Sequence, residues 1–226
     1  MEKTKMKLLI KALIKFTIGL ILVGALLFLP AGTFSYGNAW IFIGVLFIPM
    51  LILGIVLLIK APDLLEKRLN AKEQENTQKA VVGLSGLLFI ASFVVAGLDY
   101  RYGWSDIPTW GVTVASVILL ISYALYAEVM RENEYLSRTV EVRENQHVID
   151  TGLYGFVRHP MYAVTLWLFL AIPVLLGSWW SLLSLSPYIA VIVVRIQNEE
   201  KVLEEKLFGY TEYKKRVRYR ILPFIW

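Results

Sequence analysis

An all-α fold that spans a membrane is predicted by three features of the sequence. Hydrophobic residues make up 57% of the 226 residues and the mean hydropathy is +0.59, whereas soluble domains hold about 45–50% apolar residues. Several apolar runs are long enough to cross a hydrocarbon core, which takes about 20 residues. Lys and Arg gather between alternate runs. We therefore expect one polytopic membrane domain over residues 1–226, divided into N-terminal transmembrane segments, 1–130, and a more polar part, 131–226.

Six apolar segments are predicted to be transmembrane helices: 8–29, 39–59, 80–98, 110–130, 161–176 and 179–194. The last two are short and meet at Gly177-Ser178, which predicts a helical hairpin. Pro49, Pro173 and Pro187 fall inside these segments. Membrane helices tolerate such prolines where neighbouring groups or water satisfy the freed carbonyls.

The distribution of basic residues predicts the topology. Of the 23 Lys and Arg residues, 22 fall in the N-terminal arm, after the second and fourth segments, or in the tail, and only Arg101 falls on the other side. Cytoplasmic connections carry the excess of Lys and Arg, so both termini are predicted to be cytoplasmic. A signal peptide is the alternative interpretation of the Lys-rich start, but the apolar run is long and no A-x-A site follows it closely.

Several kinds of partner are not expected from the composition. The chain has no cysteine, which excludes a disulfide framework and a thiolate metal site, and we expect no metal ion. The net charge of +5 is explained by topology, so no nucleic-acid partner is expected. Membrane lipids are the predicted surroundings.

Two segments outside the spans have amphipathic patterns. The connection 60–79 predicts a short helix with Leu64, Leu65 and Leu69 on one face, which we interpret as a surface helix along the lipid headgroups without a chemical role. In the tail, apolar residues recur at helical spacing beside many cations: Val202, Leu203, Leu207, Tyr210, Tyr213 and Val217. This pattern predicts an interfacial amphipathic C-terminal segment on an anionic membrane surface.

The polar side chains that are suited to binding or catalysis are concentrated just before the fifth segment. The two histidines, His147 and His159, flank the glycine-containing stretch 148–158. Pro160 suits the first turn of a helix, which places His159 at its cap. A helix N-terminus with Arg158 beside it is suited to a carboxylate or phosphate. The structural alternative is an arginine that reaches the interface and a histidine that only caps the helix.

Opposite charges lie at the end of the sixth segment. Arg195 and Glu199 are four residues apart and therefore share a helical face, with Glu200 on the neighbouring one. In an antiparallel hairpin these residues adjoin Arg158 and His159. A salt bridge between Arg158 and a glutamate that merely closes the hairpin is the alternative to a binding site.

The pattern QHVIDTGLYGFVRHPMY, an apolar hairpin, and then RIQNEEKVLEEKLFGYTEYKKRV resembles the isoprenylcysteine carboxyl methyltransferases over roughly residues 140–226. The resemblance implies an integral membrane enzyme that moves a methyl group from S-adenosyl-L-methionine to the C-terminal carboxylate of a prenylated cysteine and releases S-adenosyl-L-homocysteine. It implies that residues 131–226 hold the cofactor-binding loop, and that the active site faces the cytoplasm. Its partner is then a lipophilic, prenylcysteine-like acceptor.

The resemblance also assigns site residues. The implied cofactor-binding residues are Gln146, His147, Val148, Gly152, Tyr154, Arg158, His159, Pro160, Tyr162, Asn198, Glu199 and Glu200. Arg195 is implied to orient the carboxyl acceptor, with Glu199 as its catalytic companion. Because a carboxylate with a reference pKa of about 3.5 is already ionised at neutral pH, the reaction needs positioning rather than a strong base.

Three other functions stay open at the level of sequence. Membrane phospholipid-amine methyltransferases and thiol methyltransferases have similar motifs and the same cofactor, but an amine or a thiol must lose a proton before it reacts. Membrane reductases of the sterol type have a similar C-terminal half, although they are usually larger. A non-enzymatic scaffold would use the same charges only to clamp the hairpin.

Overall fold

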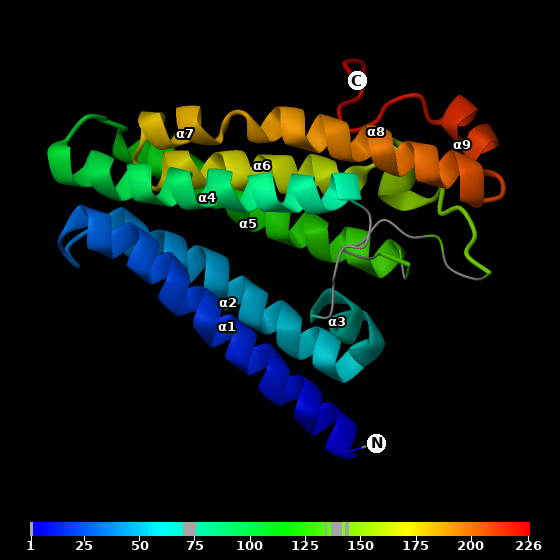
Figure 1. Ribbon diagram of the computed structural model, residues 1–226, viewed down its shortest axis with the longest axis horizontal. Helices are drawn as coiled ribbons and strands as arrows, with labels where there is room; N and C mark the ends of the chain where they lie inside the picture. Colours follow the sequence, from blue (N-terminus) through cyan, green and yellow to red (C-terminus); the bar gives the residue numbers. More distant parts are fainter. Residues whose placement is uncertain (1, 70–75, 134, 137–141, 143–144) are drawn as a thin grey trace.

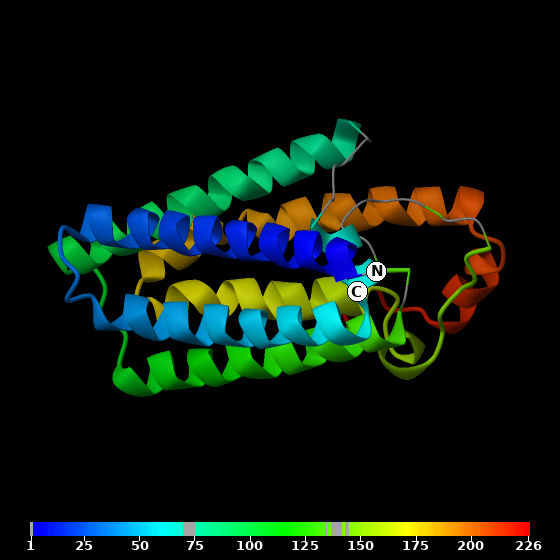
Figure 2. The ribbon, with the colours of Figure 1, turned by 90° about the horizontal axis from the view of Figure 1, so that it is seen from below.

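The chain is described here by a computed structural model, which covers residues 2–69, 76–133, 135–136, 142 and 145–226. Within those ranges the elements are α1 (Glu2–Ala31), α2 (Gly37–Lys60), α3 (Pro62–Leu69), α4 (Asn76–Tyr102), α5 (Thr109–Glu132), the 3₁₀ turn η1 (Gly152–Gly155), α6 (Pro160–Leu175), α7 (Trp179–Leu185), α8 (Tyr188–Lys206) and α9 (Tyr210–Arg216). Both termini lie at the end of the bundle that also carries α3 and α9 (Figures 1 and 2). We call this the site end, and the opposite one the turn end.

The predicted all-α membrane fold is confirmed. Among the described residues, five helical stretches are long and apolar enough to cross a membrane: Lys5–Ala31, Gly37–Lys60, Lys79–Tyr102, Thr109–Glu132 and Trp179–Lys206. The sixth apolar helix, α6, has 16 residues and is shorter than these. The predicted hairpin is also confirmed, because Gly177 has a φ of 82° at its turn and the Ser178 side chain caps α7 by accepting from the Ser181 amide.

The last predicted span differs from the prediction in its length and continuity. The helix breaks between Leu185 and Tyr188, because Pro187 lacks the amide hydrogen that would continue the ladder. After the break, α8 continues to Lys206, twelve residues beyond the predicted end at Val194. This extension carries the polar residues of the sixth segment away from the apolar part of the bundle.

The bundle is held together by a core that α1, α2, α4, α5 and α6 share. Leu27 of α1, Phe42 of α2, Phe93 of α4, Leu119 of α5 and Leu175 of α6 are buried together in one cluster. A second cluster joins α4, α6 and α8 to the C-terminal residues. The helices α1 and α2 lie near α4 and α5 at the turn end and diverge from them toward the site end (Figure 1).

A glycine sets the close approach of α1 to α4. A Cβ atom at Gly97 would lie 2.6 Å from the carbonyl oxygen of Leu27 and 3.0 Å from the Pro30 Cβ. Only a residue without a side chain fits this crossing, so Gly97 fixes how closely the two helices pack.

Both amphipathic predictions need correction. The short helix after α2 forms as α3, but Leu64 and Leu65 of its apolar face are buried and the helix packs against α1 and α2. The apolar stripe of the tail also faces protein: Leu207, Tyr210, Tyr213 and Val217 form a buried cluster with partly buried Val142, Val148 and Leu203. Helical apolar spacing has the same appearance whether lipid or protein covers it, which is why the sequence did not distinguish the two.

Candidate functional site

The predicted helix start at Pro160 is confirmed, and it is covered by the C-terminal segment. His159 is the N-cap residue of α6, and its carbonyl accepts from the amides of Tyr162 and Ala163 at 3.0 and 3.1 Å. The Arg158 amide donates to the Tyr219 carbonyl at 2.9 Å, and the His159 amide to the Arg220 carbonyl at 2.8 Å. The segment after α9 therefore returns to pair with the Arg-His-Pro motif.

Glu200 of α8 is the centre of a buried polar cluster at this joint. Its Oε1 accepts from Arg158 Nε at 2.7 Å and lies 3.2 Å from His159 Nε2, while its Oε2 accepts from Arg220 Nε at 2.9 Å. The Arg158 and Glu200 side chains are each only 4% exposed. Arg158 Nη1 also donates to the carbonyls of Val217 and Arg218, at 2.8 and 2.7 Å. Together these bonds tie α6, α8 and the C-terminal segment to one another.

A second polar group lies one turn away along α6 and α8. The Tyr162 hydroxyl donates to Glu199 Oε2 and accepts from Arg195 Nε at 2.8 Å. The Arg195 guanidinium carbon is 5.8 Å from the centre of the Tyr162 ring. The predicted shared face of Arg195 and Glu199 thus exists, and Tyr162 holds both side chains in a fixed arrangement.

These groups border a cavity of about 110 Å³ at the site end. Of the predicted site residues, the cavity brings together Gln146, His147, Val148, Tyr154, Arg158, His159, Tyr162, Arg195 and Glu199. They come from the segment before η1, the 3₁₀ turn itself, the start of α6 and the middle of α8. Residues separated by about 50 positions in the sequence therefore line one cavity.

Four predicted site residues are not among the described residues that line the cavity: Gly152, Pro160, Asn198 and Glu200. Pro160 occupies the first turn of α6, and Glu200 holds the buried cluster behind the cavity. Asn198 lies half-buried on α8. Gly152 has a φ of +52°, and a Cβ atom there would lie 1.5 Å from Glu132 Oε1. Its role in the structure is to admit the Glu132 carboxylate, which accepts from the Leu153 amide at 3.0 Å.

The cavity also has lining residues that the sequence did not assign to the site. They are Asn133, Tyr135, Leu136, Ile149, Met161, Leu203, Leu207, Tyr210 and Tyr213. Asn133 Nδ2 donates to the Tyr154 hydroxyl at 2.9 Å, and the Tyr213 hydroxyl donates to the Tyr154 carbonyl at 2.8 Å. The Tyr135 hydroxyl lies 3.0 Å from His147 Nδ1. The sequence did contain one indication for Tyr210 and Tyr213, namely the helical spacing of apolar residues in the tail. We interpreted that spacing as a face turned toward the membrane.

Tyr210 is distinct from the other polar groups of the cavity wall. Its hydroxyl oxygen is buried and has no hydrogen-bond partner among the residues that the structure describes. Burial raises the pKa of Tyr210 above its usual value of about 10, and the charges of Glu200 and Glu199 raise it further. The hydroxyl is therefore a protonated donor at neutral pH. A buried donor without an acceptor costs free energy, and a polar ligand in the cavity would remove that cost.

Comparison with known proteins supports the predicted resemblance. The model of the family described as "Isoprenylcysteine carboxyl methyltransferase (ICMT) family" matches residues 113–205, from α5 to the end of α8. A relative from Bacillus subtilis (strain 168), described as "Uncharacterized protein YpbQ", is 30% identical over 98 residues. That similarity covers 43% of this chain and 58% of the relative, so the chain spans little more than half the length of the relative that it matches.

Proposed function

Because residues 113–205 match a family of membrane methyltransferases, we propose that this protein methylates a lipophilic acceptor with S-adenosyl-L-methionine as the methyl donor. The proposed acceptor is the C-terminal carboxylate of a prenylated cysteine or a similar molecule. The observation that carries the proposal is the cavity at the site end, where Tyr162, Arg195 and Glu199 form a connected polar group and the buried Tyr210 hydroxyl lacks a partner among the described residues.

The side chains of the cavity suit the polar groups of the methyl donor. Glu199 offers carboxylate oxygens to the ribose hydroxyls or to the ammonium group. The Tyr210 hydroxyl offers a donor, and Gln146 and His147 contribute polar side chains from the segment before η1. When it is bound, S-adenosyl-L-methionine supplies a methyl group on a positively charged sulfur. The aromatic rings of Tyr154, Tyr162 and Tyr213 supply apolar walls that exclude water from this group.

The role of the protein in the reaction is to position an oxygen. The acceptor carboxylate forms a bond from its oxygen to the methyl carbon while the carbon–sulfur bond breaks, and the electron pair of that bond stays on sulfur. No proton is transferred, because the carboxylate is already ionised. Arg195 lines the cavity and donates from Nε to the Tyr162 hydroxyl, and we propose that its positive charge orients the carboxylate.

We propose for Arg158 a different role from the one that the motif suggested. A guanidinium that is 4% exposed, paired with Glu200 and bonded to two carbonyls, is suited to hold the cavity wall together. We propose that Arg158 and Glu200 position the wall and that Glu199, Tyr210 and Arg195 contact the bound molecules. The distribution of basic residues continues to predict that this end of the bundle faces the cytoplasm.

The test is methyl transfer by the purified protein in detergent or lipid discs. Labelled S-adenosyl-L-methionine is offered with N-acetyl-S-farnesylcysteine, with an aminophospholipid and with a small thiol. We expect base-labile label on the farnesylcysteine only. Label on the amine or the thiol alone would retain the methyl donor and replace the acceptor, and no label on any of them, without binding of S-adenosyl-L-homocysteine, would contradict the proposal.

Arg195→Gln and Arg131→Gln form a matched pair for the same assay. Arg131 is an exposed arginine on α5 whose side chain pairs with Glu128, and its removal should leave turnover unchanged. Arg195→Gln should lower turnover of the carboxylate acceptor strongly and retain most of the affinity for S-adenosyl-L-homocysteine. Equal loss of turnover and cofactor affinity would contradict the proposed division between Arg195 and the cofactor residues.

A further inference from the structure

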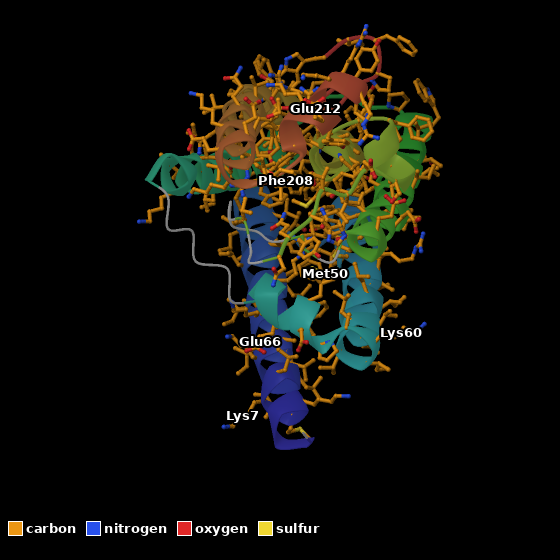
Figure 3. The ribbon with its side chains drawn as sticks, turned by 90° about the vertical axis from the view of Figure 1, so that its right-hand side faces the viewer. Lys7, Met50, Lys60, Glu66, Phe208 and Glu212 are labelled. Atoms are coloured by element: carbon orange, nitrogen blue, oxygen red, sulfur yellow. The ribbon has the colours of Figure 1, made fainter. Side chains whose placement is uncertain are left out.

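The helix α3 places a third arginine, Arg68, near the edge of the cavity. It lies between α1 and α2 at the site end, where Figure 3 shows it with Glu66 labelled. Leu64 and Leu65 are buried, and the Lys15 side chain donates to the Leu69 carbonyl at the end of the helix. These contacts fix α3 in place, although its position close to the cavity was not expected from the sequence.

Arg68 extends from α3 toward the helices that form the site. Its guanidinium carbon lies 5.3 Å from the centre of the Tyr126 ring of α5, and its Nη2 lies 3.7 Å from the Met161 sulfur of α6. Met161 is one of the residues that line the cavity. Burial raises the pKa of Tyr154, and the positive charge of Arg68 opposes that rise. Arg68 therefore interacts electrostatically with a tyrosine that lines the cavity.

The hydrogen bonds of Arg68 are incomplete. Its Nε is buried and has no partner among the described residues, and the thioether sulfur at its Nη2 is a weak acceptor. A guanidinium is suited to two parallel hydrogen bonds with a carboxylate or phosphate, and Nε and Nη2 form one such pair of donors. Because a buried donor without an acceptor is unfavourable, this geometry is more typical of a ligand site than of a purely structural residue.

We propose that Arg68 binds the negatively charged oxygen group of the lipophilic acceptor where the acceptor approaches the cavity between α3, α5 and α6. The proposal rests on the function proposed above and adds a residue outside the segment that resembles the family. Tyr126 and Met161 flank the guanidinium with apolar surface, which suits an acceptor whose charged end is attached to a hydrocarbon chain. Arg195, which lines the cavity, then orients the same group for reaction.

The structural alternative gives Arg68 only the contact with Tyr126, which would hold α3 against α5. The two roles differ in their effect on stability. If Arg68 only anchors α3, its replacement lowers the melting temperature and affects every ligand. If Arg68 serves the acceptor, Arg68→Met removes a buried donor that lacks a partner, so the melting temperature of the free protein stays unchanged or rises.

The experiment measures binding of two acceptor analogues to the purified protein in discs of phosphatidylcholine, with melting temperature and methyl transfer recorded on the same samples. The analogues are N-acetyl-S-farnesylcysteine and its carboxamide, which lacks the charge. The variants are Arg68→Met and, as the matched control, the exposed and paired Arg131→Met. We expect the wild type and the control to prefer the acid, and Arg68→Met to lose about tenfold or more in affinity for the acid alone, as for one charge-assisted hydrogen bond.

Each of the other possible results of this experiment supports or overturns the inference. An acid preference that Arg68→Met leaves intact, or a loss that affects acid, amide and melting temperature together, overturns the inference even if methyl transfer occurs. An Arg68-dependent preference without methyl transfer and without binding of S-adenosyl-L-homocysteine supports the anion site and contradicts the proposed function. Failure of the wild type to bind either analogue contradicts both. If phosphatidylglycerol in the discs abolishes the acid preference of the wild type and leaves the affinities of Arg68→Met unchanged, Arg68 serves a lipid headgroup instead of the acceptor.

Discussion

The two ends of the bundle both bury polar groups, but they satisfy them differently. At the turn end, Asp99 is only 2% exposed. Its carboxylate accepts from the Ser105 amide at 2.7 Å, from the Ser105 hydroxyl at 2.6 Å and from the Ser178 hydroxyl. Ser178 in turn caps α7. Each of these groups has a partner, and the cluster joins α4, the connection to α5 and the hairpin turn.

At the site end the polar groups divide into two kinds. Glu200 and its partners are as well satisfied as Asp99 and hold three segments together. Tyr210 Oη and Arg68 Nε, in contrast, are buried without a partner among the described residues, and both lie at or beside the cavity. We infer that the satisfied buried groups stabilise this fold, and we propose that the two unsatisfied donors contact ligands.

The largest expected effect is a loss of stability when the buried ion pair between Arg158 and Glu200 is broken. Arg158→Ala leaves the Glu200 carboxylate buried with one partner fewer, so we expect a loss of about 3–5 kcal/mol in stability, measured as a fall in melting temperature in detergent. The control is Glu204→Ala on the same helix, whose exposed pair with Lys214 should contribute little. An Arg158→Ala variant that melts like the wild type and fails to bind S-adenosyl-L-homocysteine would show that Arg158 serves cofactor binding rather than stability.

A smaller loss is expected at the turn end. Asp99→Ala leaves the Ser105 amide and the Ser178 hydroxyl without their acceptor, which costs about 1–3 kcal/mol. Affinity for S-adenosyl-L-homocysteine should not change, because Asp99 lies at the end of the bundle away from the cavity. Asp106→Ala, which removes an exposed carboxylate nearby, serves as the control for charge. A loss of cofactor affinity in folded Asp99→Ala would contradict the claim that the turn end contributes to stability and not to ligand binding.

Two glycines of the turn η1 provide a test in which a single methyl group is added to the chain. Gly152→Ala places a methyl group against Glu132 at a φ of +52°, a conformation that costs other residues about 1–2 kcal/mol. We expect lower stability and weaker cofactor binding, because Glu132 and the neighbouring Tyr154 must shift. Gly155→Ala in the same turn meets only the Asp150 carbonyl at 3.4 Å and should be tolerated. Equal melting temperatures for the two variants would show that Glu132 moves aside without cost.

The smallest effect separates two tyrosines of α9. Tyr210→Phe removes the hydroxyl without a partner, so stability should be unchanged or higher and cofactor affinity should fall roughly 2- to 10-fold, as for one neutral hydrogen bond. Tyr213→Phe removes a hydroxyl that donates to the Tyr154 carbonyl at 2.8 Å and should lower the melting temperature instead. Calorimetric titration and thermal unfolding distinguish these results, and the reverse pattern would refute the assignment of unsatisfied donors to ligands.

The sequence predicted the features that depend on local pattern. Apolar runs predicted the spans, Gly177-Ser178 predicted the hairpin turn, Pro160 predicted the start of α6, and a spacing of four placed Arg195 and Glu199 on one face. The features that it missed depend on contacts between distant segments. The pairing of Arg158 and His159 with residues 219 and 220 has no local signal. The stripe of α9 has the same spacing whether it faces lipid or protein, and only the fold shows that Tyr210 faces the cavity.

The most direct test of the central claim is a titration of the purified wild type, Tyr210→Phe and Ser178→Ala with S-adenosyl-L-homocysteine. The cavity at the site end predicts saturable binding at one site per chain, weakened by Tyr210→Phe and unaffected by Ser178→Ala at the turn end. The absence of saturable binding to the folded wild type, or an equal loss of affinity in both variants, would contradict it.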